Sequence, residues 1–305
     1  MFETPILMLV FNRPETTQEV FEAVRKVRPT HLYVAADGPR ASRTEEVRLC
    51  VEVRAIFDTV DWPCTVVRLF RDGNLGCRNA VSSGITWFFE HVEAGIILED
   101  DCLPAPDFFP YMADLLTRYK DDERVMHISG DNFLKNGRHA TLQASYYAGR
   151  ISHIWGWGTW RRAWNHYNVD IPNLSQYLDG TKRFPFRSKL ERQSFWPLFL
   201  EVGQNGKDTW DFQWLFAVLE HNGLCLHPAA NLVSNIGYGA AGTHAQDESH
   251  FLARLPTYSL PMPIRHPEVL KLDIAADDHV LHFVFYKSGL DRFKYELKTK
   301  LKKLF

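Results

Sequence analysis

Three consecutive acidic residues, Glu99, Asp100 and Asp101, follow a short apolar run of the sequence. Adjacent carboxylates repel one another, so a cation held beside them would relieve an electrostatic cost. Mg2+ and Mn2+ prefer oxygen ligands, and their sites usually combine one or two carboxylates with substrate phosphates and water. Such an ion neutralises the charge that builds on a departing diphosphate. The run therefore indicates metal-assisted chemistry on a diphosphate, with an acidic turn that closes a strand as the structural alternative.

Asp211 lies in a second chemically suggestive segment, TWDFQW. A carboxylate there can accept the proton of an acceptor hydroxyl as that hydroxyl attacks. Its aromatic neighbours Trp210 and Phe212 would raise its pKa by desolvation, which suits a base. The alternative is that Asp211 or a neighbouring residue caps the helix that follows.

Three further polar residues are candidates for contact with phosphates. Asn74 and Arg78 flank a glycine-bearing turn before a predicted helix, and a helix N-terminus attracts phosphate. His244 follows glycines that would let a loop fold over phosphates, and its imidazole suits a metal or a pyrophosphate. A surface arginine and a solvated loop histidine are the alternatives.

Tryptophans gather in the segment ISHIWGWGTWRRAWNHY, residues 151–167. Large aromatic rings can form a wall on which a sugar ring stacks. Trp155, Trp157 and Trp210 are the candidates for such an acceptor or sugar pocket. Packing in the hydrophobic core is the alternative for each of them.

The apolar pattern predicts the elements that must position these groups. Short apolar runs at 5–11, 32–36, 65–70, 95–98 and 125–129 read as strands, and segments with helical spacing separate them. Such alternation predicts an α/β fold with a mostly parallel central sheet flanked by helices. Ligands of such sheets bind at the carboxyl ends of the strands. Asp37, Asp72 and the acidic run should therefore converge on one rim.

Residues 1–265 read as one domain, and residues 266–305 as a C-terminal extension. Within it, residues 287–305 carry seven basic and two acidic side chains, a net charge of +5, beside a stripe of apolar residues. A basic amphipathic helix of this kind binds an anionic membrane surface. A solvated helix docked on the domain is the alternative.

The overall composition limits the classes of protein that fit. The chain has 305 residues and a formal net charge of -2, which argues against a nucleic-acid-binding protein. Its five cysteines form no paired metal-binding spacing and favour a reducing compartment. We find no signal peptide and no apolar run long enough to span a membrane. We therefore expect a cytoplasmic protein, peripheral on the inner face of the cell membrane if the basic tail binds lipid.

The segment ILEDDCLPAPDFFPYM, residues 97–112, resembles the strand, acidic motif and following helix of N-acetylglucosaminyltransferase I and of related bacterial nucleotide-diphospho-sugar transferases. Other segments resemble the same family in the same order and extend the likeness from residue 6 to about residue 245. They are ILMLVFNRP (6–14), VAADGPR (34–40), HISGDN (127–132), IWGWGTWRRAW (154–164) and TWDFQW (209–214).

The resemblance implies a GT-A fold, which is Rossmann-like, with Mn2+ or Mg2+ as cofactor. It implies that Asp101 ligates the metal directly, that Asp100 contacts the ribose or reaches the metal through water, and that Glu99 faces the donor sugar. It also implies that Asp37 hydrogen-bonds the nucleotide base and that Arg13 lies beside the base or phosphates. Asp211 would be the general base of an inverting, single-displacement reaction.

The expected activity is therefore transfer of a sugar from a nucleotide diphosphate donor, with UDP as the favoured nucleotide. The acceptor would be a glycan or a lipid-linked sugar of a bacterial surface polysaccharide. Sugar-phosphate nucleotidyltransferases share the sheet type but usually have a glycine-rich loop with a basic residue after the first strand. Here FNRPETT, residues 11–17, has no glycine. The third hypothesis is a non-catalytic protein that binds a nucleotide sugar.

Overall fold

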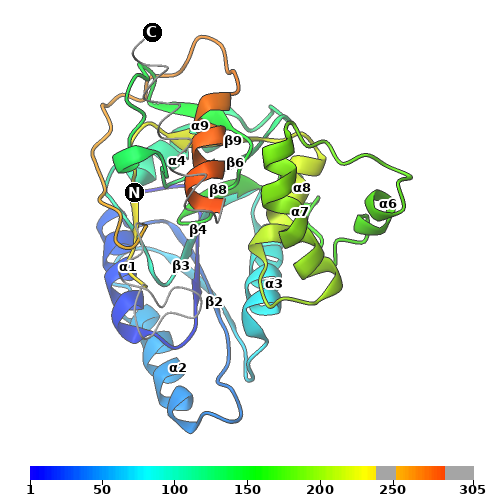
Figure 1. Cartoon of the computed structure of the whole chain (residues 1–305). Helices are drawn as coiled ribbons and strands as arrows, with labels where there is room; N and C mark the ends of the chain where they lie inside the picture. Colours follow the sequence, from blue (N-terminus) through cyan, green and yellow to red (C-terminus); the bar gives the residue numbers. More distant parts are fainter. Residues whose placement is uncertain (238–251, 286–305) are drawn as a thin grey trace.

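The computed structural model describes residues 1–237 and 252–285. A sheet flanked by helices forms its centre (Figure 1). The sheet has eight strands in the order β3-β2-β1-β4-β8-β6-β9-β7. Strand β1 is parallel to β2 and β4, β2 is parallel to β3, and β6 is parallel to β9. The remaining pairs are antiparallel. This architecture confirms the expected α/β class, with a mostly parallel sheet flanked by helices.

The strands of this sheet are β1 (Ile6–Val10), β2 (His31–Ala36), β3 (Thr65–Phe70), β4 (Ala94–Glu99), β6 (Val125–Ser129), β7 (Tyr146–Gly149), β8 (Trp157–Trp160) and β9 (Leu224–Pro228). A two-stranded sheet joins β5 (Cys102–Pro104) to β10 (Val233–Asn235). The longer helices are α1 (Pro14–Val27), α2 (Thr44–Ile56), α3 (Gly76–His91), α4 (Phe108–Arg118), α7 (Lys189–Gln204) and α8 (Asp211–Glu220). The shorter ones are α5 (Arg161–Trp164), α6 (Leu174–Leu178), α9 (Ile274–Val280), η1 (Phe57–Thr59), η2 (Lys135–Gly137) and η3 (Leu281–Phe285).

Strand β1 shows why the sheet is covered on both faces. All five of its residues are buried. Ile6, Met8 and Val10 pack in a core with α1, α2 and α4, whereas Leu7 and Leu9 pack in a second core with α3 and α8. Successive side chains of a strand point to opposite faces, so an uninterrupted apolar run needs a helical layer on each side.

Strand β8 comes from the tryptophan-rich segment and occupies the middle of the sheet. It runs antiparallel between β4 and β6, with Gly158 opposite both Ile96 and Ile128. Because β8 is antiparallel to both neighbours, β4 and β6 run in the same direction. The carboxyl ends of β1, β2, β3, β4 and β6 therefore share one rim of the sheet, as the sequence predicted.

The described part of the C-terminal extension contacts the sheet. Leu272 forms an isolated bridge with Ala148 of β7, and the carboxylate of Asp277 in α9 accepts hydrogen bonds from the backbone N–H of Arg150. The domain boundary at residue 265 stays a prediction, and the basic tail at 287–305 lies outside the described residues. No helix in the described ranges is long and apolar enough to cross a membrane.

Candidate functional site

The order of the strands reverses between β1 and β4. From β1 the chain builds outward through β2 and β3, and then returns to add β4 on the other side of β1. Ligands of open α/β sheets bind in the crevice at the carboxyl ends of the strands where the order reverses. That crevice lies between the segment that follows β1, which carries Arg13, and the acidic run that follows β4.

Arg13 joins the two sides of this crevice. Its guanidinium donates to Asp100 Oδ1 at 2.5 Å and to Asp101 Oδ2 at 2.9 Å. The first turn of α1 holds the backbone of Arg13, because the N–H and hydroxyl of Thr17 donate to its carbonyl at 3.0 and 2.6 Å. The structure thus brings together Arg13 and the acidic run, although Arg13 and Asp101 are 88 residues apart in the sequence.

The carboxylates of this crevice outnumber the arginine, and the pKa values reflect the imbalance. Burial, and then the charges of Asp101 and Asp100, raise the pKa of Glu99 to about 8. Burial also raises the pKa of Asp100, although the nearby Arg13 opposes the shift. Burial lowers the pKa of the Arg13 guanidinium, but Asp100 and Asp101 outweigh it and the pKa lies above its ordinary value. A site with surplus buried negative charge stabilises a proton or a cation.

The segment after β10 lies against Asp101. The N–H of Ile236 donates to the carbonyl of Asp101 at 2.8 Å. At Gly237 an added Cβ would collide with the Asp101 side chain and with the guanidinium of Arg13. Glycine is therefore required where the glycine-rich segment starts beside the acidic run. His244, the second predicted metal ligand, lies outside the described residues.

The acidic run has the donor chemistry that a Mg2+ or Mn2+ ion needs. One oxygen of Asp101 faces Arg13 and the other lies 3.5 Å from Cys102 Sγ. Among the residues that the structure describes, none forms a hydrogen bond with the buried Asp100 Oδ2. Within the described ranges, no three His, Cys, Asp or Glu side chains form a metal-binding group. One or two carboxylates completed by substrate phosphates are enough for these ions, so the residues present fit that kind of site.

Asp211 is the first residue of α8. The hydroxyl of Thr209 donates to Asp211 Oδ1. The negative charge of Asp211 contributes to the raised pKa of Glu99 and of Cys77, so the three side chains share one electrostatic environment. The structure thus brings the predicted base close to the acidic run, and its role as a base stays a prediction.

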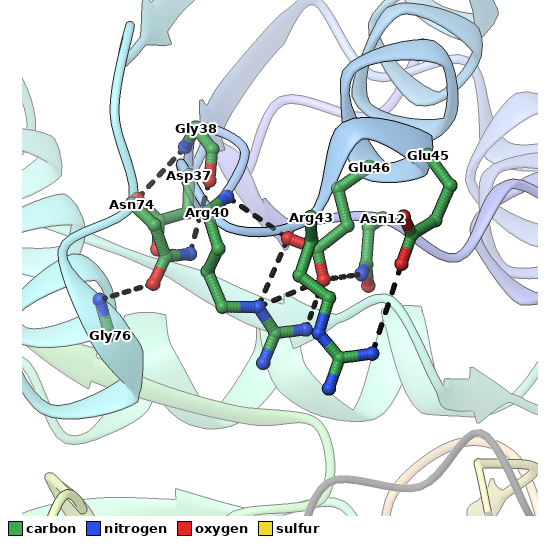
Figure 2. Close-up of polar contacts among 9 residues, drawn as sticks. All are labelled: Asn12, Asp37, Gly38, Arg40, Arg43, Glu45, Glu46, Asn74 and Gly76. Carbon is green, nitrogen blue, oxygen red and sulfur yellow. Dashed lines mark hydrogen bonds and ion pairs between the residues drawn. The ribbon is translucent and has the colours of Figure 1, made fainter.

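Asp37 and Asn74 are joined by a side-chain hydrogen bond (Figure 2). The amide of Asn74 donates to Asp37 Oδ2 at 2.8 Å, and the backbone N–H groups of Gly38 and Leu75 donate to Asp37 Oδ1 at 2.9 and 3.0 Å. Burial raises the pKa of Asp37, and the bonds from Leu75 and Gly38 oppose the shift. Asp37 thus ties the end of β2 to the turn before α3. These hydrogen bonds lie within the protein, and the contact of Asp37 with a nucleotide base stays a prediction.

Arg78 has partners other than a phosphate. Its guanidinium donates to Asp170 Oδ1 at 2.8 Å and to the carbonyl of Val169 at 2.7 Å. The N-terminus of α3 accommodates a carboxylate, because the N–H groups of Cys77 and Arg78 donate to Asp208 at 3.2 and 2.8 Å. The predicted anion position at this helix therefore contains the side chain of Asp208.

The prediction that Trp155, Trp157 and Trp210 form a sugar pocket is wrong for two of them. Trp157 and Trp210 are 0% and 2% exposed and stack on each other at 5.7 Å between ring centroids. Both belong to the core that packs the sheet against α3 and α8, so neither ring offers a face on which a sugar can stack, and the packing alternative holds. Trp155 is only partly buried, and its backbone N–H donates to Asp131 Oδ2 at 3.1 Å. Of the three, Trp155 alone keeps some exposed surface for a ligand.

Sequence reasoning missed a group of polar residues beside Asp37. Glu46 of α2, Arg40 and Asn12 are joined by hydrogen bonds (Figure 2). No motif in the sequence distinguishes Glu46 from the adjacent Glu45, because both are acidic residues in the first turn of one helix. Only the fold shows that Glu46 is buried.

Comparisons with known proteins find similarity of overall structure only. No family model matches the chain, and no curated protein sequence matches it. A UDP-glucose pyrophosphorylase complexed with UDP-glucose is similar with a TM-score of 0.41 and 9% identity, covering 76% of this chain and 93% of that one. HddC from Yersinia pseudotuberculosis is similar with a TM-score of 0.31 and 7% identity, covering 52% of this chain and 77% of that one.

The comparisons do not show the expected resemblance to N-acetylglucosaminyltransferase I. The first of these structures is a pyrophosphorylase with bound UDP-glucose, the kind of ligand expected for this chain. With TM-scores below 0.5, these likenesses assign no reaction to this chain.

Proposed function

We propose that the chain is an enzyme that acts on nucleotide sugars in the β1/β4 crevice. The observation that carries the proposal is the surplus of carboxylates around Arg13 at the point where the strand order reverses. A sugar nucleotide supplies what this crevice lacks, because its diphosphate can bring a divalent cation to the carboxylates. Asp101 would hold that ion, and the ion would supply neutralising charge for a diphosphate leaving group.

Within this class we propose glycosyl transfer as the reaction, with Asp211 as the base. The charge of Asp211 influences Glu99, and a carboxylate in that neighbourhood would accept the proton of an acceptor hydroxyl. Arg13 would keep Asp100 and Asp101 in fixed positions, and Glu99 would face the donor sugar. The acceptor remains the predicted glycan or lipid-linked sugar, and membrane contact by the tail remains part of the same proposal.

Sugar-phosphate nucleotidyl transfer is the second candidate, since enzymes of that class share the expected sheet type. The connection from β1 to α1 bears on this choice. It consists of Phe11, Asn12 and Arg13 and has no glycine, so it is not the glycine-rich loop expected of that class. This connection favours glycosyl transfer.

The identity of the products separates the two reactions. The purified chain would be incubated with Mn2+ and a panel of UDP-sugars, and separately with UTP and sugar 1-phosphates. Glycosyl transfer, or the hydrolysis that accompanies it without acceptor, releases UDP from the first mixture. Nucleotidyl transfer releases pyrophosphate from the second and would overturn the glycosyltransferase proposal. Release of neither product, with no binding of any nucleotide sugar, would contradict the whole proposal.

A further inference from the structure

Glu46 lies where the segments that follow β1 and β2 meet. It belongs to the first turn of α2, and its side chain points toward Asn12 and Arg40 (Figure 2). Asn12 comes directly before Arg13 of the crevice, and Arg40 comes three residues after Asp37. One carboxylate therefore contacts both loops on this side of the rim.

The contacts of Glu46 use both of its oxygens. Oε1 accepts from Asn12 Nδ2 at 3.2 Å and from Arg40 Nε at 2.8 Å, and it also pairs with Arg40 Nη2. Oε2 accepts from the backbone N–H of Arg40 at 3.0 Å. A carboxylate that binds both the side chain and the backbone of one arginine fixes where that arginine points.

Burial and exposure divide this pair into two roles. The Glu46 side chain is 3% exposed, whereas that of Arg40 is 45% exposed. The guanidinium of Arg40 lies 5.5 Å from the centre of the Phe11 ring. In the part of the chain that the structure describes, no hydrogen-bond partner reaches Arg40 Nη1. Glu46 is thus covered by protein, and Arg40 presents a planar charged surface toward solvent.

The adjacent pair on α2 provides a natural contrast. Glu45 and Arg43 are 3.8 Å apart, and both side chains are 59% exposed. An exposed pair at that distance contributes little and orders little. Glu45 and Glu46 lie in the same helix turn. Only Glu46 fixes the position of an arginine.

We propose that Glu46 is a positioning residue for the nucleoside end of the donor, and that Arg40, held by Glu46 over Phe11, is the residue that contacts it. A guanidinium plane is a surface on which a base can stack, and its free N–H can donate to a base or ribose oxygen. This inference rests on the proposed function, because it assigns the far end of the same nucleotide-sugar ligand. It adds a recognition group at β2, beyond the acidic run at β4.

The test compares Glu46→Gln with Glu45→Gln, which changes the same residue type one position away. Titration calorimetry with UDP and Mn2+ measures the nucleotide end alone, and steady-state kinetics with UDP-glucose or the donor found above separate KM from kcat. We expect Glu46→Gln to weaken UDP binding and raise the donor KM about tenfold, because a disordered Arg40 loses a charged contact. We expect kcat to stay within about twofold, and Glu45→Gln to match the wild type.

A second variant guards against misfolding. Arg40→Lys leaves a positive charge near Glu46 but cannot form the paired contact or the planar surface. It should weaken UDP binding as Glu46→Gln does.

Several results would overturn the inference. A folded Glu46→Gln protein with a UDP affinity within twofold of the wild type would show that the positioning role is wrong, and it would leave the proposed function untouched. If Glu46→Gln does not fold, the same result with Arg40→Lys would have the same meaning. A fall in kcat at unchanged KM would indicate a structural role only. Failure of the wild type to bind any nucleotide or nucleotide sugar would remove the proposed function and this inference together.

Discussion

Two arginines meet carboxylates on the same rim of the sheet, and the two places differ in charge balance. At the β1/β4 crevice, Arg13 contacts Asp100 and Asp101 while Glu99 adds a third acid nearby. Beyond the end of β2, Arg40 contacts the carboxylate of Glu46, and no second carboxylate pairs with it in the described ranges. The pKa of Glu99 is raised by burial and by its acidic neighbours, whereas the hydrogen bond from Arg40 lowers the pKa of Glu46.

The opposite shifts separate two uses of the same residue types. A buried carboxylate matched by one arginine is satisfied within the protein and fixes the position of that arginine. A buried carboxylate surplus is unfavourable until a proton or a cation arrives, and such sites are where ligands and chemistry gather. We therefore expect the crevice to bind metal and nucleotide. We expect the Arg40–Glu46 pair to keep the Arg40 side chain in a fixed position.

The largest effect should come from Asp211, which belongs to the crevice by its charge. Asp211→Asn removes the proton acceptor but keeps the size of the side chain, so kcat should fall about 10²–10⁴-fold while donor KM changes little. Steady-state kinetics with the donor measure both values. Asp170→Asn, a surface carboxylate beside Arg78, is the control and should keep its activity. A kcat within threefold of the wild type would show that Asp211 has only a structural role at the start of α8.

Replacement of Arg13 should show how far its positive charge stabilises the buried carboxylates of the crevice in the absence of ligand. Arg13→Met leaves buried Asp100 without its cation, which should lower the free energy of unfolding by about 3–5 kcal/mol at pH 8. The loss should shrink at pH 5, where Asp100, with its raised pKa, takes up a proton. Urea unfolding at the two pH values measures the difference. Arg43→Met at an exposed pair should cost less than about 1 kcal/mol, and equal losses in the two variants would contradict the account.

Glu99→Gln should make the metal-free protein more stable at alkaline pH. The folded-state pKa of Glu99 is about 8, above the unfolded value, so the folded chain binds the extra proton and its unfolding free energy falls as the pH rises through this range. Glutamine carries no proton to lose. Chemical unfolding in EDTA should therefore show the variant ahead of the wild type at pH 8.5 and level with it near pH 4. A variant that is less stable at both pH values would place Glu99 in a balanced pair.

Glu46→Gln should show the opposite sign and the smallest effect on stability. Because Arg40 lowers the folded-state pKa of Glu46, its contribution is present above the ordinary glutamate pKa and is lost as the pH falls through the folded value. The variant should be about 1–3 kcal/mol less stable than the wild type at pH 7, and the gap should close toward pH 3. Parallel unfolding curves of the two proteins from pH 3 to pH 7 test this, and a gap that does not change with pH would contradict it.

The first half of the fold could be predicted from sequence because its strands are uninterrupted apolar runs. Thr65–Phe70 and Val125–Ser129 form strands with the predicted bounds. The middle strand β8 could not be predicted, since tryptophan and glycine at 157–160 give no alternation and their burial depends on neighbours far along the chain. The three-residue strands β5 and β10 exist only because they pair with each other.

The candidate site was partly predictable for the same reason. The carboxyl ends of parallel strands must meet on one rim, which brought Asp37 and the acidic run to the same edge. Trp157 and Trp210 were named for a sugar pocket because an exposed and a buried aromatic ring look alike in sequence. Glu46 and Glu45 likewise look alike, and only packing against the β1 and β2 loops distinguishes them.

The central claim is that the acidic run holds a divalent ion together with a nucleotide diphosphate. Calorimetric titration of UDP-glucose, with and without Mn2+, tests it on the wild type, on Asp101→Asn and on Asp72→Asn, an exposed carboxylate of the same rim. The account predicts that Mn2+ tightens binding at least tenfold in the wild type and in Asp72→Asn, and that Asp101→Asn loses this gain. Full manganese-dependent affinity in Asp101→Asn would contradict it.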